Sequence, residues 1–536
     1  MKERAVLSYK FGGAALALAL GTILLAKTAW GQSSSTAQRN GGGTAAGSSS
    51  GDVSAVVKAQ QQLAQPGPNV TPQSNTATDP SFRGSIARDK ATTGVLDLTL
   101  DDAMQRGLRN NLGLVLQSAN EKSAAGQRLQ QLQALLPTVT GQASIEVQQV
   151  NLAAFGLKFP GIKPIVGPFQ VVDFRAYLTQ NLINVQALEN YIAAKHNFAA
   201  AKLTAEDARD LVVLTVGNAY LLCIADAARI ASVKAEMDTS KVSLDQANDA
   251  HEAGTSPRLD VLRAQVDYQN VQQNLIATTN QYEKDKLNLA RAIGLPLDQK
   301  FRLVDIAPFA ALDAPDAEAA FQQALKQRKD LAAAAESLKA AQSAKKAAWA
   351  EQLPAASFSG DFGDLGTTPA HSHGTYTATG EVTAPILQIA KTRGDALVTG
   401  AQVEQAQARL SDQVQQVNAD IRGSILDIQS AAKLVDATKS NADLAREALS
   451  EAQQRFRAGV DTSLAVSQAL TTSEQANDQY ISALYQHNVA KLALARALGV
   501  ASTNYKDYVN GTAVPGGAGQ SSTDANAPAK NDLGGK

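Results

Sequence analysis

The sequence has little cysteine, no charge excess of either sign and no even spread of prolines. Each of these absences excludes a class of protein. Cys223 is the only cysteine in 536 residues, which excludes an intramolecular disulfide framework and a zinc site built from cysteines. The 49 Lys and Arg balance 50 Asp and Glu, so nucleic acid is not the expected main partner. The 17 prolines gather in a few places, which argues against a string of small globular domains.

The first 31 residues have the layout of a secretory signal peptide. Three basic residues precede an apolar run over Phe11–Ala26, and small residues stand at Ala29 and Gly31 before an expected cut. The alternative is an uncleaved membrane anchor, but the apolar run is shorter than the roughly 20 residues that a spanning helix needs. Beyond residue 31 we find no segment apolar enough for a transmembrane helix. An exported chain of this kind is either soluble or crosses a membrane as a β-barrel.

Two copies of one unit form the folded part of the chain. Leu108 and Pro137 recur as Leu325 and Pro354 at an offset of 217 (325 − 108), whereas later pairs such as Gly254 and Gly459 differ by 205 (459 − 254). We therefore predict a first repeat at 95–300, a second at 301–501, and an insertion in the proline-rich stretch of the first. Residues 32–94 and 502–536 have the composition of a flexible low-complexity leader and a flexible tail.

Each repeat contains a very long proline-free segment. Asn184–Glu252 and Lys391–Ala458 hold no proline, and their apolar residues recur every three or four positions. A helix of that length spans about 100 Å at 1.5 Å per residue, which no ordinary globular core requires. Gly254 and Gly459 suit left-handed helix ends, and return helices are expected up to about residues 293 and 498. A further helix is expected over Leu100–Leu136.

A period of two replaces the helical period in two places, which predicts one β-hairpin at about 138–181 and another at about 355–384. Apolar residues alternate with polar ones in four segments of about ten residues, including Val139–Gln148 and Ala356–Phe362. Such strands fit a membrane barrel or, as the alternative, a half-buried sheet of a soluble protein. Four strands cannot close a barrel, because the smallest have about eight, and an open edge in lipid is costly. The barrel interpretation therefore requires several subunits to share one barrel.

The chain resembles the TolC-like outer membrane efflux proteins, the outer membrane factors of tripartite pumps and type I secretion. The resemblance covers about residues 95–501 and rests on the order and duplication of motifs, which are Leu98–Asn111 (LTLDDAMQRGLRNN), Ala253–Gln265 (AGTSPRLDVLRAQ), Arg455–Gly459 (RFRAG), Leu289–Gly294 (LARAIG) and Leu494–Gly499 (LARALG). It implies a mainly α protomer with four membrane strands. It also implies a homotrimer whose 12-stranded barrel continues as a helical periplasmic tunnel.

The resemblance implies a location and partners as well. The location is the outer membrane of a Gram-negative-type bacterium, in contact with its lipid. The partners are a periplasmic adaptor and an inner membrane pump or ABC transporter. The inner membrane partner supplies the energy, and this chain serves as a passive export conduit. The adaptor is expected to contact the two helical turns, at Ala253, Gly254, Thr255, Ser256, Ala458, Gly459, Val460, Asp461 and Thr462.

The same resemblance points to the mouth of the tunnel. Some members carry acidic residues just after the second turn, but the matching positions here are the neutral Ala465 and Gln468. Asp260 and Asp461 are then the remaining acidic candidates for the mouth. A capping role or a solvated helix face is an equally weighted alternative for both.

No catalytic, cofactor or metal site emerges from the sequence, so we expect a protein that is not an enzyme. His371 and His373 share a loop, but a solvated loop is favoured over a metal site, and the glycine-rich stretches lack the context of a phosphate loop. The alternative function is a structural coiled-coil surface or adhesion protein, which explains the long helices but not the four alternating strands. A secreted enzyme ranks third, because no nucleophile, base or metal ligands converge.

Overall fold

The structure is a computed structural model that describes residues 80–87, 90–92, 94–157, 159–305 and 310–512. All of these belong to one unit, Pro72–Lys536. The predicted signal peptide (1–31), most of the predicted leader (32–94) and the end of the predicted tail lie outside the described residues.

The first repeat follows the predicted order of helix, hairpin and long helical hairpin. α2 (Leu100–Asn110) and α3 (Leu112–Gln133) lead to strands β2 (Thr138–Asn151) and β3 (Ile165–Ile183). α4 (Val185–Glu252) then runs for 68 residues and α5 (Arg258–Ile293) returns beside it. Short 3₁₀ helices lie at Pro80–Arg83 (η1) and Leu152–Phe155 (η2).

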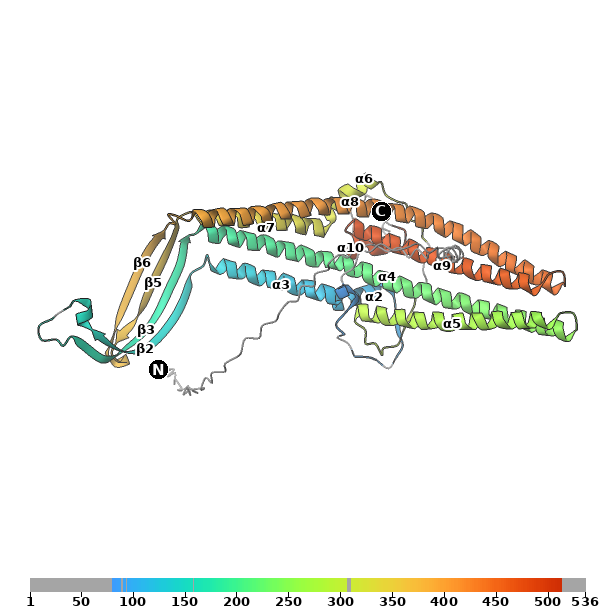
Figure 1. Ribbon diagram of the computed structural model, residues 1–536, viewed down its shortest axis with the longest axis horizontal. Coiled ribbons are helices and arrows are strands. Elements are labelled where there is room, and N and C mark those ends of the chain that lie inside the picture. The colour runs from blue at the N-terminus through green and yellow to red at the C-terminus, as the bar shows by residue number, and fades with distance from the viewer. Residues whose placement is uncertain (1–79, 88–89, 93, 158, 306–309, 513–536) are drawn as a thin grey trace, which may run out of the picture. The chain divides into compact units, whose positions relative to one another are not determined.

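The second repeat has the same order. α6 (Ala317–Gln327) and α7 (Lys329–Ala350) precede β5 (Ala355–Gly366), the 3₁₀ helix η3 (Pro369–His371) and β6 (Ser372–Thr383). α8 (Ile389–Arg457) has 69 residues, α9 (Ser463–Ala497) returns along it, and α10 (Ala501–Val509) ends the described chain. Within this unit the four strands lie at one end of the long helices and both helical turns lie at the other (Figure 1).

The four long strands form one antiparallel sheet in the order β2-β3-β5-β6. Its register brings the apolar sets of the four strands onto a single face: Gly141 pairs with Ala176, Ala176 with Phe362, and Phe362 with Tyr376. The polar sets share the other face, where Arg175 forms ion pairs with Asp173 (3.1 Å) and Asp361 (2.5 Å). The alternation seen in the sequence is therefore a property of the whole sheet and not of single strands.

Most of the apolar face of this sheet is open in the single chain. Ile145, Val147 and Val382 are 66%, 69% and 73% exposed. A sheet of a soluble protein would bury such residues against a second layer. The strands are also longer than the predicted ten residues, with 14 and 19 residues in the first hairpin against 12 and 12 in the second. The extra length of the first repeat thus lies in its β-hairpin, where the sequence offset placed it.

The main core lies where both repeats meet, between the strands and the helical turns. Tyr220 of α4, Ile293 of α5, Ile421 of α8 and Leu492 of α9 are fully buried there. Two short strands that the sequence analysis missed, β1 (Leu96–Leu98) and β4 (Phe301–Leu303), pair in parallel beside it. They join the start of the first repeat to the start of the second.

The folded part extends beyond both boundaries predicted from composition. Within the stretch predicted as a flexible leader, Phe82 is buried and Thr92 donates its backbone N–H to Gln299 (2.7 Å). Within the predicted flexible tail, α10 buries Tyr505 and Tyr508, and the Lys491 ammonium donates to the carbonyl of Val509 at its end (3.0 Å). Isolated apolar and aromatic residues hold these segments on the core although their average composition is polar.

The predicted helix over Leu100–Leu136 is two helices. Asn111 ends α2 and begins α3, and its side chain accepts a hydrogen bond from the N–H of Gly113 (3.0 Å). It also donates to the carbonyl of Phe82 (2.6 Å), so the break ties η1 to the bundle. The equivalent break in the second repeat lies at Arg328, between α6 and α7.

One helix contradicts the expectation that nothing beyond residue 31 is apolar enough to span a membrane. Among the described residues, α4 contains a window of 18 residues with a mean hydropathy of 1.8. However, 61% of that window is buried inside the protein. We therefore assign its apolar character to the core formed with α2, α5 and α9, where Val212, Val216 and Leu221 are buried.

Candidate functional site at the helical turns

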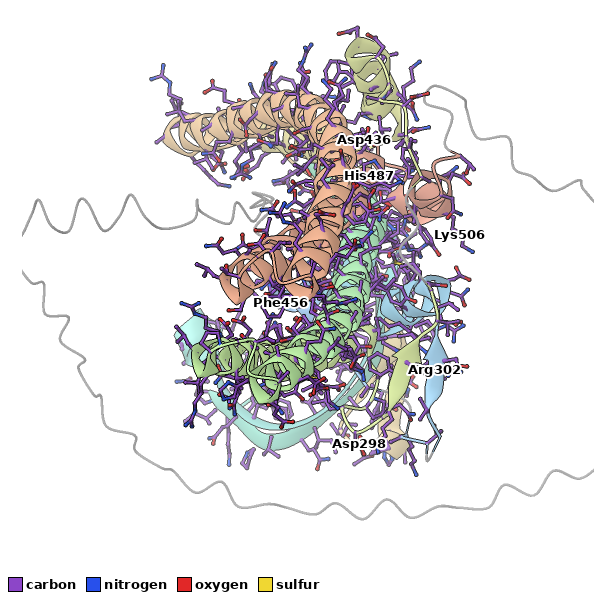
Figure 2. All side chains as sticks on the ribbon, turned by 90° about the vertical axis from the view of Figure 1, so that its right-hand side faces the viewer. Asp298, Arg302, Asp436, Phe456, His487 and Lys506 are labelled. Carbon is purple, nitrogen blue, oxygen red and sulfur yellow. The ribbon has the colours of Figure 1, made fainter. Side chains whose placement is uncertain are left out.

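The two helical hairpins lie side by side, and their turns are exposed. Figure 2 looks along the hairpins from the turns and shows the α4–α5 pair next to the α8–α9 pair. Gly254 and Gly459 have φ angles of 74° and 73°, which only glycine adopts without strain. Nothing else in the described protein lies within 4 Å of a β-carbon at either position, so both turns face solvent in the single chain.

The first turn is held by hydrogen bonds to the end of α4. The N–H and the hydroxyl of Thr255 both donate to the carbonyl of Ala250 (2.9 Å each), which closes the turn after Ala253 and Gly254. The Ser256 hydroxyl donates to Asp260 Oδ2 (2.6 Å). Pro257 is the N-cap of α5 and makes no side-chain cap hydrogen bond. Asp260 accepts the hydrogen bond from Ser256 and does not cap the helix itself.

The second turn is built in the same way, with its acidic residue facing its own loop. Ala458 and Gly459 end α8, and the N–H of Val460 donates to the carbonyl of Arg455 (3.1 Å). Asp461 forms an ion pair with Arg455 (3.2 Å) and accepts a hydrogen bond from the N–H of Thr462 (2.8 Å). Asp461 therefore stabilises the turn locally.

Asp260 joins the two hairpins. Its second carboxylate oxygen accepts a hydrogen bond from the hydroxyl of Ser463, the first residue of α9, 203 residues away. Burial raises the pKa of the Asp260 carboxyl, but the bonds from Ser256 and Ser463 and the charge of Arg263 outweigh it, so its pKa lies below the ordinary value. Asp260 is thus ionised at neutral pH and holds both turns together as an acceptor.

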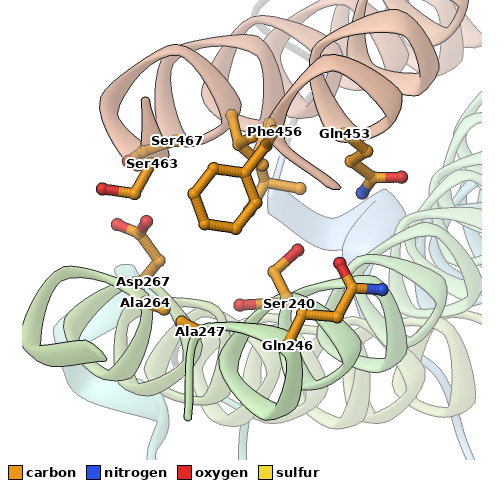
Figure 3. Close-up of a pocket in the computed structure, with 12 residues that line it drawn as sticks. Ser240, Gln246, Ala247, Ala264, Asp267, Gln453, Phe456, Ser463 and Ser467 are labelled. Carbon is orange, nitrogen blue, oxygen red and sulfur yellow. The ribbon is translucent and has the colours of Figure 1, made fainter. Parts of the chain in front are cut away.

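Phe456 fills the space between the hairpins next to this contact. Its ring projects from α8 toward α4 and α5, opposite Ser240, Ala247 and Ala264 (Figure 3). The cavity that remains between this ring and the first hairpin is only about 20 Å³. Small residues on α4 and α5 provide the room for the ring.

The structure brings together some of the candidate residues for the tunnel mouth and not others. Asp260 lies at the contact between hairpins, whereas Asp461 lies within the second turn. Ala465 is half-buried and Gln468 is exposed, both on α9. Sequence reasoning missed Ser463 and Phe456, although the motif RFRAG that carries Phe456 is part of the resemblance. The available signal was that each lies within four residues of the turn glycine Gly459.

The two histidines that we expected in one loop lie in η3 and at the start of β6, and the described residues around them offer no metal geometry. His371 Nδ1 lies 2.9 Å from the Thr368 hydroxyl in η3, and His373 follows in β6. No group of three His, Cys, Asp or Glu side chains that could hold a metal ion is found over the described residues. Cys223 is fully buried, and this burial raises the pKa of its thiol, so it behaves as a core residue.

Comparison with known families decides what this arrangement is. Residues 103–295 and 320–500 match the outer membrane efflux protein family. The chain belongs to this family. The matched segments correspond to the two repeats, and the assignment places this efflux protein in the outer membrane.

Individual relatives agree with the family assignment. The chain is 25% identical over 312 residues to OpmQ, a pyoverdine export outer membrane protein of Pseudomonas putida; the match covers 57% of this efflux protein and 66% of OpmQ, just under two thirds. The fold is similar to that of the outer membrane protein VceC of Vibrio cholerae, with a TM-score of 0.66 and 19% identity over 75% of this chain and 96% of VceC. The CmeC outer membrane channel of Campylobacter jejuni gives a TM-score of 0.67 and 17% identity over 83% and 98% of the two chains.

Proposed function

We propose that three copies of this efflux protein form a passive export duct across the outer membrane and the periplasm. The observation that carries the proposal is the sheet of four strands, whose apolar residues share one exposed face and whose edge strands β2 and β6 have no partner among the described residues. Three such sheets give a barrel of 12 strands (3 × 4), in which every edge is paired and the apolar face meets lipid.

The polar face of the sheet then lines the water-filled path. The ion pairs of Arg175 with Asp173 and Asp361 lie on this face, together with Thr377 beside Asp361. Charged groups of this kind are acceptable in a wet barrel interior and costly in lipid. A coiled-coil surface fibre, the alternative function, explains the long helices but would leave the apolar face in water.

The helical hairpins form the periplasmic part of the duct. Their exposed turns, from Ala253 to Ser256 and from Ala458 to Thr462, present mostly small side chains at the far end from the strands. We assign these turns to contacts with a periplasmic adaptor, and assign the energy of transport to an inner membrane pump or ABC transporter. No catalytic step is assigned to this chain.

Opening of the duct requires the helical turns to separate. Asp260 and Phe456 hold the α4–α5 turn to the α8–α9 turn, and their loss lets packed helices slide apart at these ends. The closed arrangement is therefore stabilised by a few contacts near the two turns.

Single-channel recording in planar bilayers tests the duct and this contact together. Purified wild-type protein should give step-like currents. Asp260→Ala, which removes the acceptor shared by Ser256 and Ser463, should increase the open-to-closed ratio by about tenfold or more, because a charge-assisted hydrogen bond contributes about 1.5–3 kcal/mol. Asp461→Ala is the matched control and should leave the open fraction near wild type, since Asp461 bonds only within its own turn in the described structure. A wild-type protein that gives no steps would overturn the proposed duct.

A further inference from the structure

A second cavity between the hairpins, closer to the core, has the size and polar lining of a ligand site. It measures about 370 Å³ and lies between α4, α5 and α9. Two contacts between the hairpins border it: Arg229 Nε donates to Asp478 Oδ1 (2.7 Å), and the amide of Asn274 donates to Glu474 Oε1 (2.5 Å). Its volume is within the range of small-molecule pockets.

The polar groups around this cavity include several donors that are already engaged. Arg229 also donates to Asp226 (3.2 Å) and to the Ser482 hydroxyl (2.8 Å). The hydroxyls of Thr278 and Thr471 donate to backbone carbonyls of their own helices. A molecule in the cavity therefore meets many hydrogen-bond acceptors, which selects for a ligand that donates.

Glu236 of α4 is the independent observation that points to a ligand. It lines the cavity and is only 7% exposed. Its Oε1 accepts a hydrogen bond from the Ser232 hydroxyl (3.0 Å), but no donor among the described residues reaches its buried Oε2. A buried carboxylate oxygen without a donor is costly, so a cationic donor at this point would be strongly favoured.

The distribution of charge decides the kind of cation. The cavity has three carboxylates, Glu236, Glu474 and Asp478, against the single guanidinium of Arg229. Glu236 lies on α4, whereas Glu474 and Asp478 lie on α9, so the carboxylates face a ligand from different walls of the cavity. We propose that this cavity binds an aliphatic diamine, with one ammonium at Glu236 on the first hairpin and the other at Glu474 and Asp478 on the second.

Such a ligand would connect the two hairpins. Because it contacts α4 and α9 together, it binds best when these helices are close and therefore favours the arrangement in which the hairpins stay together. The binding site does not depend on the barrel. Binding measured in detergent is thus informative even if the bilayer recordings fail, and the two tests can fail separately.

The protonation state of Glu236 makes the binding dependent on pH. The charged groups that line the cavity are Arg229 and Glu236 on α4 and Glu474 and Asp478 on α9, with none on α5. Burial, aided by the charges of Glu474 and Asp478 and opposed by the Ser232 hydrogen bond, raises the pKa of Glu236 to about 7. Protonation competes with the ammonium, so binding should weaken as the pH falls through 7.

Isothermal titration calorimetry of the full-length protein in detergent, with 1,5-diaminopentane at pH 8, tests the proposal. We expect saturable binding that becomes about tenfold weaker in Glu236→Gln, a difference of about 1.4 kcal/mol. Glu474→Gln, which keeps an acceptor for Asn274, should weaken binding as a second and independent variant. At pH 5.5 the wild-type affinity should fall toward that of Glu236→Gln.

Matched controls separate this site from general attraction to an acidic surface. Glu447→Gln removes an exposed carboxylate of α8 and should leave the affinity unchanged, and 1,5-pentanediol, which has no charge, should not bind. Equal affinities of wild type and Glu236→Gln would overturn the proposal. The absence of saturable binding at pH 8 would also overturn the proposal. Glu236 would then be a buried carboxyl group that only exchanges protons with water.

Discussion

The substitution Ile145→Arg should prevent stable insertion of this efflux protein in the outer membrane. Ile145 lies at the middle of β2, is 66% exposed on the apolar face and pairs with Val172 of β3. An arginine on the lipid side of a barrel is destabilising, by up to about 2–4 kcal/mol at the bilayer centre. In the proposed trimer each subunit contributes the same strand, so this cost arises three times in one barrel.

Ser144→Arg is the matched control for this experiment. Ser144 is the neighbouring residue of the same strand, but it lies on the polar face and pairs with Asp173, which offers an opposite charge. We expect near-normal amounts of Ser144→Arg protein in purified outer membranes and strongly reduced amounts of Ile145→Arg. Equal amounts of the two variants would show that the apolar face does not meet lipid.

The second large effect is expected at Arg328, which joins α7 to α8. Arg328 is 5% exposed at the break between α6 and α7, and forms ion pairs with Asp330 (2.6 Å) and with Asp420 of α8 (3.2 Å). Burial raises the pKa of Asp330, but the bonds and charge of Arg328 outweigh this effect and hold its pKa below the ordinary value. Arg328→Ala would leave two carboxylates without their cation and should cost about 3–5 kcal/mol.

Chemical unfolding followed by circular dichroism measures this cost. Arg328→Ala should unfold at a clearly lower denaturant concentration than wild type, with Arg328→Met also destabilised because it removes the same charge. Arg446→Ala is the control: its ion pair with Asp443 is exposed, and surface pairs contribute little. Wild-type stability of Arg328→Ala would contradict the role of this buried pair in joining α7 to α8.

Periodicity in the sequence is enough to predict the long helices and the strands. The segments Asn184–Glu252 and Lys391–Ala458 correspond to α4 and α8 within a few residues, because proline-free amphipathic segments of this length have no other stable form. The register that aligns Ala176 with Phe362 follows from the same alternation, since a shift by one residue would mix the two faces.

Contacts between distant segments are what the sequence alone could not supply. Asp260 and Ser463 are 203 residues apart, and neither residue type marks a contact. The break at Asn111 was missed because apolar residues continue on both sides of it, although asparagine and the following Gly113 are typical of a helix start. Phe82, the only aromatic residue in 32–94, was hidden by the average composition of its surroundings.

Disulfide cross-linking between edge strands tests the central claim most directly. On a Cys223→Ala background, Gln142→Cys in β2 is combined in turn with Thr375→Cys, Thr377→Cys or Thr379→Cys in β6, all on the polar face. If β2 of one subunit pairs with β6 of the next, at least one pair lies within the reach of a disulfide, about 4.4–6.8 Å between α-carbons. The account predicts dimers and trimers, and nothing larger, on a denaturing gel without reductant. Monomers alone from all three pairs, in protein extracted from outer membranes, would contradict it.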